Sequence, residues 1–495
     1  MSSIRSRLPP IVAASGTYLA AQALLLLAGL ISMPITTRLL SKSEYGLLSV
    51  AFTAAAVLSL IGRLGLGDAA VRLYSEYRQQ PGAQLRELCE SLLSGTFLAS
   101  ALLALGVAVV IGRADGQWSP IVILIAALAV VRAVSTVVFE IQRAQERAFA
   151  YALSQLGIRY GTTIVAVAAM LVWARTAVAV IAAGLLVEVA VLGWRLAELR
   201  RHGLIARPRL SPVVRAALSY GLPLALAGSA RYVLDYGDRL LIERMLGLEA
   251  VAIYSVPYDL AHRLGDALML PVQLAAVPLL FRLWVEKGPE AASRMASQVL
   301  TYVIALSAPV VVLYLLYNQA VIVLLASTTY TASAALTPYL LPGILLERLS
   351  FVVVVGLTVQ KRTVPLALIL CAVALLNFIL NLLLIPVWHL TGAAIATTTA
   401  YAAMFTAQYW MSRASIRLRV DGMVVAKAAA ATAAAVALLS FTDRIRVSDV
   451  TGVLISVVAG GAVAFAVFAV LDARLRRALR PLPWTTSNET DATSG

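Results

Sequence analysis

Residues 235–256 read DYGDRLLIERMLGLEAVAIYSV and concentrate charge in a chain that is otherwise mostly apolar. In and just before this stretch, four charged residues of alternating sign follow at four-residue spacing: Arg231, Asp235, Arg239 and Glu243. That spacing places them on one face of a helix. Two interpretations are open. The residues form an ion ladder that neutralises itself where the helix leaves a membrane, or they belong to a polar pathway at membrane depth.

The composition of the whole chain indicates that a membrane is involved. Of the 495 residues, 61% are hydrophobic and 13% are charged, whereas soluble domains average about 45–50% and about 25%. Apolar runs close to the roughly 20 residues that cross a bilayer recur throughout. The sequence therefore predicts an all-α polytopic membrane protein with about fourteen transmembrane helices. The predicted spans are residues 11–33, 46–66, 89–112, 119–139, 150–173, 176–195, 214–236, 250–281, 297–318, 331–354, 362–385, 389–411, 422–441 and 450–472.

Basic residues predict how the chain is oriented. Lysine and arginine concentrate in alternate connections, most densely at 195–215 and 474–480. Because such residues collect in cytoplasmic loops, both termini are expected in the cytoplasm, which agrees with an even number of spans. The same rule accounts for the net charge of +15 and leaves no need for nucleic acid as a partner.

An internal repeat predicts the domain organisation. Residues 36–50, TTRLLSKSEYGLLSV, share Arg-Leu-Leu, a short loop and a tyrosine before small residues with the opening stretch. The two copies are six spans apart, so the halves are expected to be parallel six-helix bundles, with two extra C-terminal helices. The predicted parts are an N-terminal bundle (1–195), a basic cytoplasmic linker (196–213), a C-terminal bundle (214–412), helices 13 and 14 (413–475) and a disordered cytoplasmic tail (476–495).

Arginine is the charge that recurs at membrane depth, in six predicted positions: Arg63, Arg132, Arg159, Arg231, Arg263 and Arg348. Arginine stays charged when buried, and its planar fork suits phosphate. These residues therefore predict a water-filled cavity that receives an anion. The alternative is that each arginine pairs with a local acid, Arg263 with Asp259 or Arg348 with Glu347, or extends to the interface.

Enzyme chemistry is not visible in the sequence. There is no phosphate-binding G-x-x-x-x-G-K-[ST] loop and no H-E-x-x-H motif, and the two cysteines give no metal-ligand spacing. We therefore predict no catalytic residues, no metal site and no cofactor. Asn377 and Asn381 share one helix face, and Gly392 begins a thin stretch that favours close helix packing rather than substrate contact.

Three motifs together resemble one family, the bacterial polysaccharide flippases of the Wzx type, in the superfamily of the multidrug and toxic-compound exporters and the lipid II flippase. The motifs run in the family's order over nearly the whole chain. They comprise Pro34, Arg38, Tyr45 and Gly46; then Gly221, Pro223, Asp238, Arg239, Gly247 and Tyr254; then Lys361, Arg362, Thr363, Asn377, Asn381, Pro386, Gly392 and Thr397. One departure is Trp388-His389-Leu390, where the family usually has a glycine-containing turn.

The resemblance implies a fourteen-helix protein with two six-helix lobes around a central cavity. It also implies that the protein flips an undecaprenyl-pyrophosphate-linked oligosaccharide from the inner to the outer leaflet of the bacterial inner membrane by alternating access, for surface polysaccharide biosynthesis. Ion or potential coupling occurs in some related flippases, and Asp259 and Asp266 are the candidates here. Arg38, Asp238, Arg239, Asn377, Asn381 and Gly392 would be structural motif residues. Membrane lipids, a polysaccharide polymerase and a chain-length regulator are the implied partners.

Other functions stay open at this point. A lipid II flippase would share the substrate's lipid and diphosphate. An exporter of cationic drugs would favour acids at membrane depth and twelve spans, and a membrane-bound polymerase or glycosyltransferase would need a large outer loop. We also expect Arg239→Ala to impair transport less than Arg263→Ala.

Overall fold

The computed structural model describes residues 10–80, 82–114, 119–360, 362–443 and 450–473. Within these ranges the chain is helical and has no β-strand, as predicted. Eleven of the described helices are long and apolar enough to cross a membrane. Two of them are each broken into two stretches, and α15 (Val450–Leu471) contains a shorter apolar stretch, Val458–Leu471. The described residues thus contain the fourteen predicted spans. The predicted tail, residues 476–495, lies outside them.

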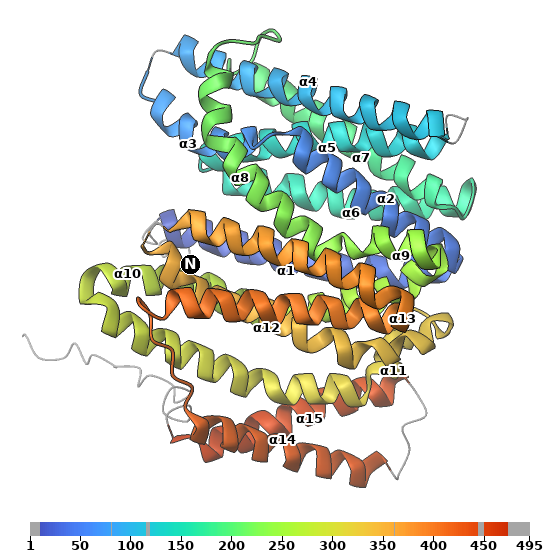
Figure 1. The fold of residues 1–495 in the computed structure, drawn as a ribbon, viewed down its shortest axis with the longest axis vertical. Coiled ribbons are helices and arrows are strands. Elements are labelled where there is room, and N and C mark those ends of the chain that lie inside the picture. The colour runs from blue at the N-terminus through green and yellow to red at the C-terminus, as the bar shows by residue number, and fades with distance from the viewer. Residues whose placement is uncertain (1–9, 81, 115–118, 361, 444–449, 474–495) are drawn as a thin grey trace, which may run out of the picture. The chain divides into compact units, whose positions relative to one another are not determined.

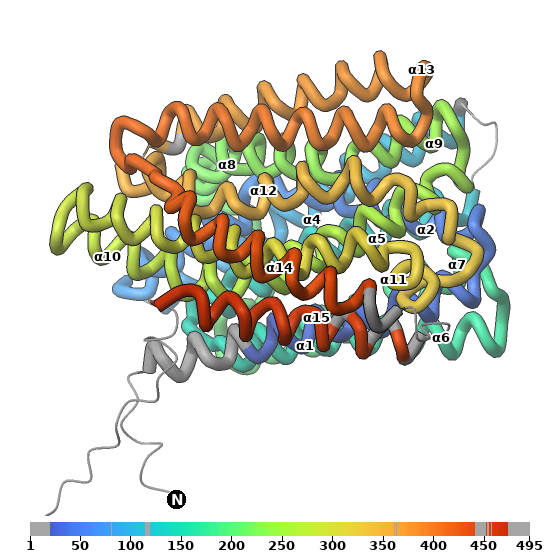
Figure 2. Tube along the Cα trace, turned by 90° about the horizontal axis from the view of Figure 1, so that it is seen from below, coloured from blue at the N-terminus to red at the C-terminus, as the bar shows by residue number. Residues whose placement is uncertain are grey.

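The two long helices break where one residue leaves helical geometry. In α10 (Leu248–Leu316) this residue is Gly288, with φ 81°, a left-handed value that costs glycine nothing. In α13 (Thr363–Ser412) it is His389, with φ 50°, in the segment where the sequence departs from the glycine-containing family turn. A side chain at Gly392 would collide with the Leu384 carbonyl, so the chain reverses tightly here, and the two stretches of α13 lie side by side (Figures 1 and 2).

The described helices form two compact units. The larger unit spans residues 1–296 and 318–418, and its helices run with roughly aligned axes (Figure 1). Besides α10 up to residue 296 and α13, its elements are α1 (Pro10–Leu39), α2 (Lys42–Gly62), α3 (Leu66–Tyr77), α4 (Gly82–Ala114), α5 (Pro120–Ala144), α6 (Ala148–Val172), α7 (Ala177–Arg201), α8 (Val213–Tyr236), α9 (Asp238–Leu246), α11 (Asn318–Leu325), the 3-10 helix η1 (Thr328–Leu336) and α12 (Thr337–Thr358).

Three short helices were not predicted: α3, α9 and α11. Each is too short to span a bilayer. α3 carries Asp68, Arg72 and Glu76 along its length. A search for long apolar runs therefore assigns this segment to a loop. The α3 helix nevertheless buries Leu66, Ala69, Leu73 and Tyr74, because one face of it packs against its neighbours.

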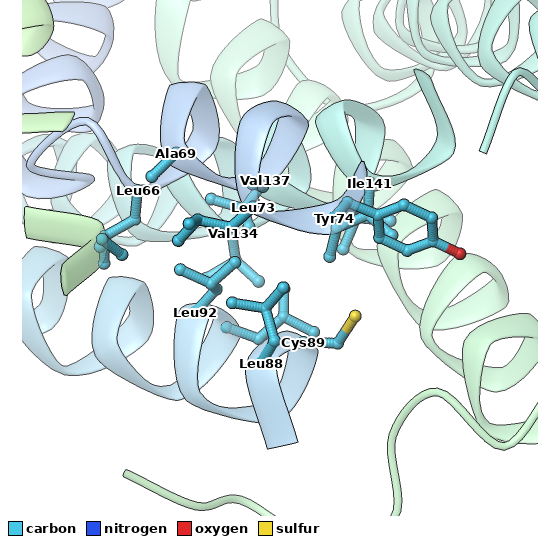
Figure 3. Packing of buried hydrophobic residues seen from close by; sticks show 14 of the residues in the cluster. Leu66, Ala69, Leu73, Tyr74, Leu88, Cys89, Leu92, Val134, Val137 and Ile141 are labelled. Carbon is cyan, nitrogen blue, oxygen red and sulfur yellow. The ribbon is translucent and has the colours of Figure 1, made fainter. Parts of the chain in front are cut away.

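An apolar core holds α3 in place. Figure 3 shows side chains of α3 meeting Leu88, Cys89 and Leu92 of α4 and Val134 and Val137 of α5. These side chains are almost completely buried, and burial of this kind contributes roughly 1.5–3 kcal/mol for each large apolar side chain. The core therefore fixes the first bundle around α5.

Within the larger unit, the two predicted bundles approach each other closely at several places, two of which involve glycines. Ser49 of α2 and Ser255 of α10 form a hydrogen bond of 2.9 Å, and a side chain at the neighbouring Gly46 would collide with the Leu248 carbonyl. The second approach joins Gly65 and Gly221. A Cβ atom added to either glycine would collide with the backbone carbonyl oxygen of the other. Backbones can approach this closely only where side chains are absent.

The smaller unit comprises residues 297–317 and 419–495. In its described part, α14 (Gly422–Asp443) packs beside α15 (Figure 2), and the two bury an apolar cluster with Ala305. Tyr302 donates to Asp472 at 3.1 Å, and Lys427 pairs with the same carboxylate. Division of the chain into the bundles 1–195 and 214–412 stays a prediction.

Candidate substrate cavity

A cavity opens between helices of the two predicted bundles within the larger unit. It has two adjoining parts, of about 340 Å³ and about 540 Å³. The parts share five lining residues: Phe52, Tyr232, Arg239, Asp259 and Arg263. Each part lies within the usual size range of ligand sites.

Four of the six predicted arginines line this cavity: Arg132, Arg159, Arg263 and Arg348. Arg63 and Arg231 do not. With Arg239, five arginines face three carboxylates, those of Glu188, Asp259 and Asp266. The cavity wall is therefore basic.

Two of the cavity arginines meet at one point on α1. A side chain at Gly29 would collide with the Arg263 guanidinium and would lie 3.4 Å from Nη2 of Arg159. Arg159 is within hydrogen-bonding distance, 3.5 Å, of Ser32 Oγ, and Nε of Arg263 is buried without a hydrogen-bond partner. In the part of the chain that the structure describes, no carboxylate lies within ion-pair distance of either guanidinium. We call these two residues the free arginine pair.

The remaining charges on this side of the cavity are paired. Nε of Arg132 donates to Glu188 at 2.8 Å, and the Glu188 side chain is 5% exposed. Arg239 donates to Asp259 at 2.5 Å and to Ser49 at 3.0 Å. Asp259 thus neutralises Arg239, whereas its neighbour Arg263 is left without an acid.

On the other side of the cavity, Arg348 belongs to a dense charge network. It pairs with Asp266 and with the adjacent Glu347, each at 3.1 Å, and one of its nitrogens lies 2.9 Å from Nδ1 of His262. Glu347 also binds Arg231. This part of the site is therefore close to charge balance.

The ion ladder of the opening stretch is only partly formed. Arg231 pairs with Asp235 at 2.9 Å, but the next step is broken because Arg239 points to Asp259 instead. Arg231 does not line the cavity and is bound by two acids. For Arg231, the structure agrees with the alternative in which an arginine at membrane depth pairs with nearby acids.

Arg63 and Arg38 also lie away from the cavity. Arg63 ends α2, and Asp68 and Glu140 are the carboxylates that act on it electrostatically. Arg38 donates to the carbonyl oxygen of Leu324 at 2.7 Å. Since Leu324 lies in the last turn of α11, Arg38 caps that helix end.

Other polar motif residues are buried and form two hydrogen-bonded groups. Asp238, 1% exposed, accepts hydrogen bonds from Tyr254 at 2.5 Å and from Thr397 at 3.3 Å. Asn381 donates to both the carbonyl and the side-chain oxygen of Asn377. The two asparagines share one face, as the sequence predicted.

Several cavity residues were missed from the sequence. Glu188 is an acid inside an apolar run. A charged residue at membrane depth marks a functional site by default, so the sequence does contain the signal for Glu188. The aromatic side chains of the lining are Tyr45, Phe52, Tyr232 and Tyr236. Phe52 lies under Arg132 at 5.0 Å, and the rings of Tyr232 and Tyr236 are 4.8 Å apart. No residue spacing marked these rings as cavity residues.

Among the described residues, no group of three or more His, Cys, Asp or Glu side chains could hold a metal ion.

Comparison with known proteins identifies the fold and the family. The family model described as "Polysaccharide biosynthesis protein" matches residues 11–284. An uncharacterized membrane protein of Methanocaldococcus jannaschii is 25% identical over 201 residues, which are 40% of this chain and 39% of that protein. The chain thus spans well under two thirds of the length of this relative.

Two solved structures share the fold over most of their length. The lipid II flippase MurJ in an inward closed conformation superposes with a TM-score of 0.67 and 12% identity, over 95% of this chain and 100% of that one. An inward-facing multidrug resistance transporter of the MATE family and MOP superfamily gives a TM-score of 0.62 and 13% identity, over 79% and 94%.

Proposed function

The chain belongs to the family of polysaccharide biosynthesis proteins, and we propose that it flips a polyprenyl-diphosphate-linked oligosaccharide between the leaflets of a bacterial inner membrane. The free arginine pair carries this proposal. Two guanidinium groups that share one point in a cavity, without acids to neutralise them, repel each other and favour an anion between them. A diphosphate offers charge and acceptor oxygens that match two arginine forks.

The charge balance of the cavity argues against a cationic drug as substrate. Five lining arginines exceed three lining carboxylates, so an organic cation would meet a repulsive wall. Lipid II is a closer rival, because it also carries a polyprenyl diphosphate. The family match supports the polysaccharide substrate over lipid II.

The aromatic residues suit the sugar part of the substrate. Phe52, Tyr232 and Tyr236 line the same space as the free arginine pair. Aromatic rings bring apolar faces at a small entropic cost, and the tyrosine hydroxyls add a polar handle. In this proposal the diphosphate lies at Arg159 and Arg263, and the first sugars lie against these rings.

Alternating access would move the two bundles, residues 1–195 and 214–412, about this site. The distribution of basic residues supports cytoplasmic termini. Asp259 and Asp266 are candidates for ion coupling, because each is the acid of a cavity ion pair that protonation would release. A polymerase and a chain-length regulator would act on the delivered oligosaccharide.

Flipping in proteoliposomes tests the proposal. A fluorescent polyprenyl-diphosphate oligosaccharide is incorporated, and its accessibility to a membrane-impermeant quencher is followed for wild type and for Arg159→Gln/Arg263→Gln. We expect protein-dependent flipping in the wild type and a loss of at least about tenfold in the variant, since each charge-assisted hydrogen bond contributes about 1.5–3 kcal/mol.

The matched control is Arg282→Gln/Arg294→Gln. These arginines are 71% and 73% exposed and outside the cavity lining, so the same loss of charge should leave flipping unchanged. Lipid II and a cationic dye are assayed in parallel. Faster transport of either one than of the oligosaccharide would replace the proposed substrate, and full activity of the cavity variant would remove the arginine pair from the site.

A further inference from the structure

A second site lies outside the cavity, where the connection between α7 and α8 folds back over the first bundle. A groove of about 570 Å³ runs between α4, α7 and residues 205–208. Its apolar wall includes Leu93 and Phe97 of α4 and Leu196 of α7. Val134 at its floor belongs to the core cluster shown in Figure 3, so the groove rests on a packed base.

Polar contacts hold the connection as a fixed wall of the groove. Oε1 of Glu90, a residue only 8% exposed, accepts from the backbone N–H groups of Ala206 at 2.6 Å and Arg207 at 3.1 Å. Ser94 accepts from the backbone N–H of Arg209 at 3.1 Å. The Glu90 carboxylate is therefore used to satisfy backbone donors.

Two arginines of the groove lining have no ion-pair partner among the described residues and can bind an anionic ligand. Arg200 and Arg207 are exposed and line the groove. Within the described residues neither has a carboxylate at ion-pair distance, since the nearby Glu198 is bound by Arg147 and Arg195. Arg209, further along, pairs with Glu87 at 3.6 Å. The groove thus combines an apolar wall with two arginines and one carboxylate, that of Glu90, so its lining carries a net positive charge.

The groove continues into an exposed apolar surface on α4. Phe97, Leu98, Leu102 and Leu105 are 58%, 47%, 61% and 58% exposed, as expected for side chains that face lipid. Trp194 of α7 is half exposed and stacks on Arg195 at 3.8 Å. An exposed tryptophan near the end of a span is typical of the membrane–water interface. A headgroup at the arginines would therefore have its acyl chains beside α4.

We propose that this groove binds one anionic phospholipid, with its phosphate between Arg200 and Arg207 and an acyl chain along the apolar face of α4. Charge complementarity selects an anionic headgroup, and the apolar floor selects a lipid over a free phosphate. Basic pockets between membrane helices bind such headgroups. The site lies on the connection between the two predicted bundles, and it does not depend on which substrate the protein carries.

Native mass spectrometry of the full chain tests the site. Phosphatidylglycerol is titrated against the purified protein, with phosphatidylcholine as the zwitterionic reference. The wild type should retain one phosphatidylglycerol in preference to phosphatidylcholine. Arg200→Gln/Arg207→Gln should weaken that binding by about twenty-five-fold, roughly fivefold for each arginine near an anionic lipid.

A second variant changes the groove without changing charge. The space beyond Gly193 is open, with no atom within 4 Å of an added Cβ, so Gly193→Leu fills the groove without a backbone clash. It should also abolish preferential binding, whereas Gly106→Leu, at an equally open position on α4 outside the groove, should not.

Arg78→Gln/Arg86→Gln is the charge control, because both side chains are exposed near the same end of α4 and neither lines the groove. The site would be overturned if the wild type retained both phospholipids equally. It would also be overturned if this control weakened phosphatidylglycerol binding as much as Arg200→Gln/Arg207→Gln does, because the binding would then be non-specific electrostatic attraction. Unchanged binding in both groove variants would overturn it as well.

Discussion

Arg239 and Arg263 border the same cavity but differ in what surrounds them. Arg239 is 6% exposed and holds Asp259 and Ser49. Removing one member of a buried ion pair leaves an uncompensated charge and costs about 3–5 kcal/mol of unfolding free energy. That is an upper bound here, because the Asp259 side chain is 26% exposed. We expect Arg239→Ala to lower the melting temperature in detergent.

Arg263→Ala should not lower the melting temperature. It removes a like charge beside Arg159, so the melting temperature should stay level or rise, while flipping falls at least tenfold. Stability gained and activity lost in one variant is the usual sign of a functional strained site. Thermal melts and flipping assays on both variants, at matched amounts of folded protein, check this. If the two variants had equal melting temperatures and equal flipping rates, the proposed difference between a structural Arg239 and a substrate-binding Arg263 would be wrong.

Residue types at membrane depth could be predicted from the sequence, but their pairing could not. The sequence offered Asp259 as the partner of Arg263, four residues away on one helix. In the structure, Asp259 instead pairs with Arg239, which lies on α9. Likewise Glu188 and Arg132 are far apart in the chain and meet only because α5 and α7 pack together. Local spacing carries no information on such contacts.

At the scale of helices, the approach of α8 to the start of α3 rests on two glycines. Alanine at Gly221 would place Cβ against the Gly65 carbonyl, and forced overpacking costs about 1–3 kcal/mol. The matched control is Gly228→Ala on the same helix, where Cβ would meet only Leu60 at 3.9 Å. Gly228→Ala should hold or raise the melting temperature, because alanine favours a helix by about 1 kcal/mol over glycine.

Gly221→Ala should lower the melting temperature despite the same gain in helix propensity. Melts of both variants in one detergent measure the difference directly. Identical melting temperatures would mean that α8 shifts easily and that the close approach contributes no stability.

Long apolar helices were predictable for a physical reason: a bilayer demands about 20 apolar residues in each span. All fourteen appear in the described residues. The short helices escaped prediction because no such demand applies to them. α3 is stabilised by packing on α4 and α5, and Arg38 caps α11 from a position distant in sequence.

For the whole molecule, the family match confirms that the chain is a polysaccharide biosynthesis protein, and the two solved structures share its fold. The repeat that predicted two halves also marks where they touch. Ser49 follows the first copy's tyrosine by four residues, Ser255 follows the second copy's tyrosine directly, and the two hydroxyls are 2.9 Å apart. If the bundles move as alternating access requires, this contact must open in every transport cycle.

A disulfide at this contact would test that requirement. In a background with Cys89 and Cys371 replaced by alanine, Ser49→Cys/Ser255→Cys should cross-link under oxidation, because the two side chains already touch. We expect oxidised protein to flip less than a tenth as fast as reduced protein, with full recovery on reduction, while each single cysteine variant is insensitive to oxidant. Undiminished flipping by the cross-linked protein would mean that α2 and α10 stay together throughout the cycle, and that the moving boundary lies elsewhere in the bundle.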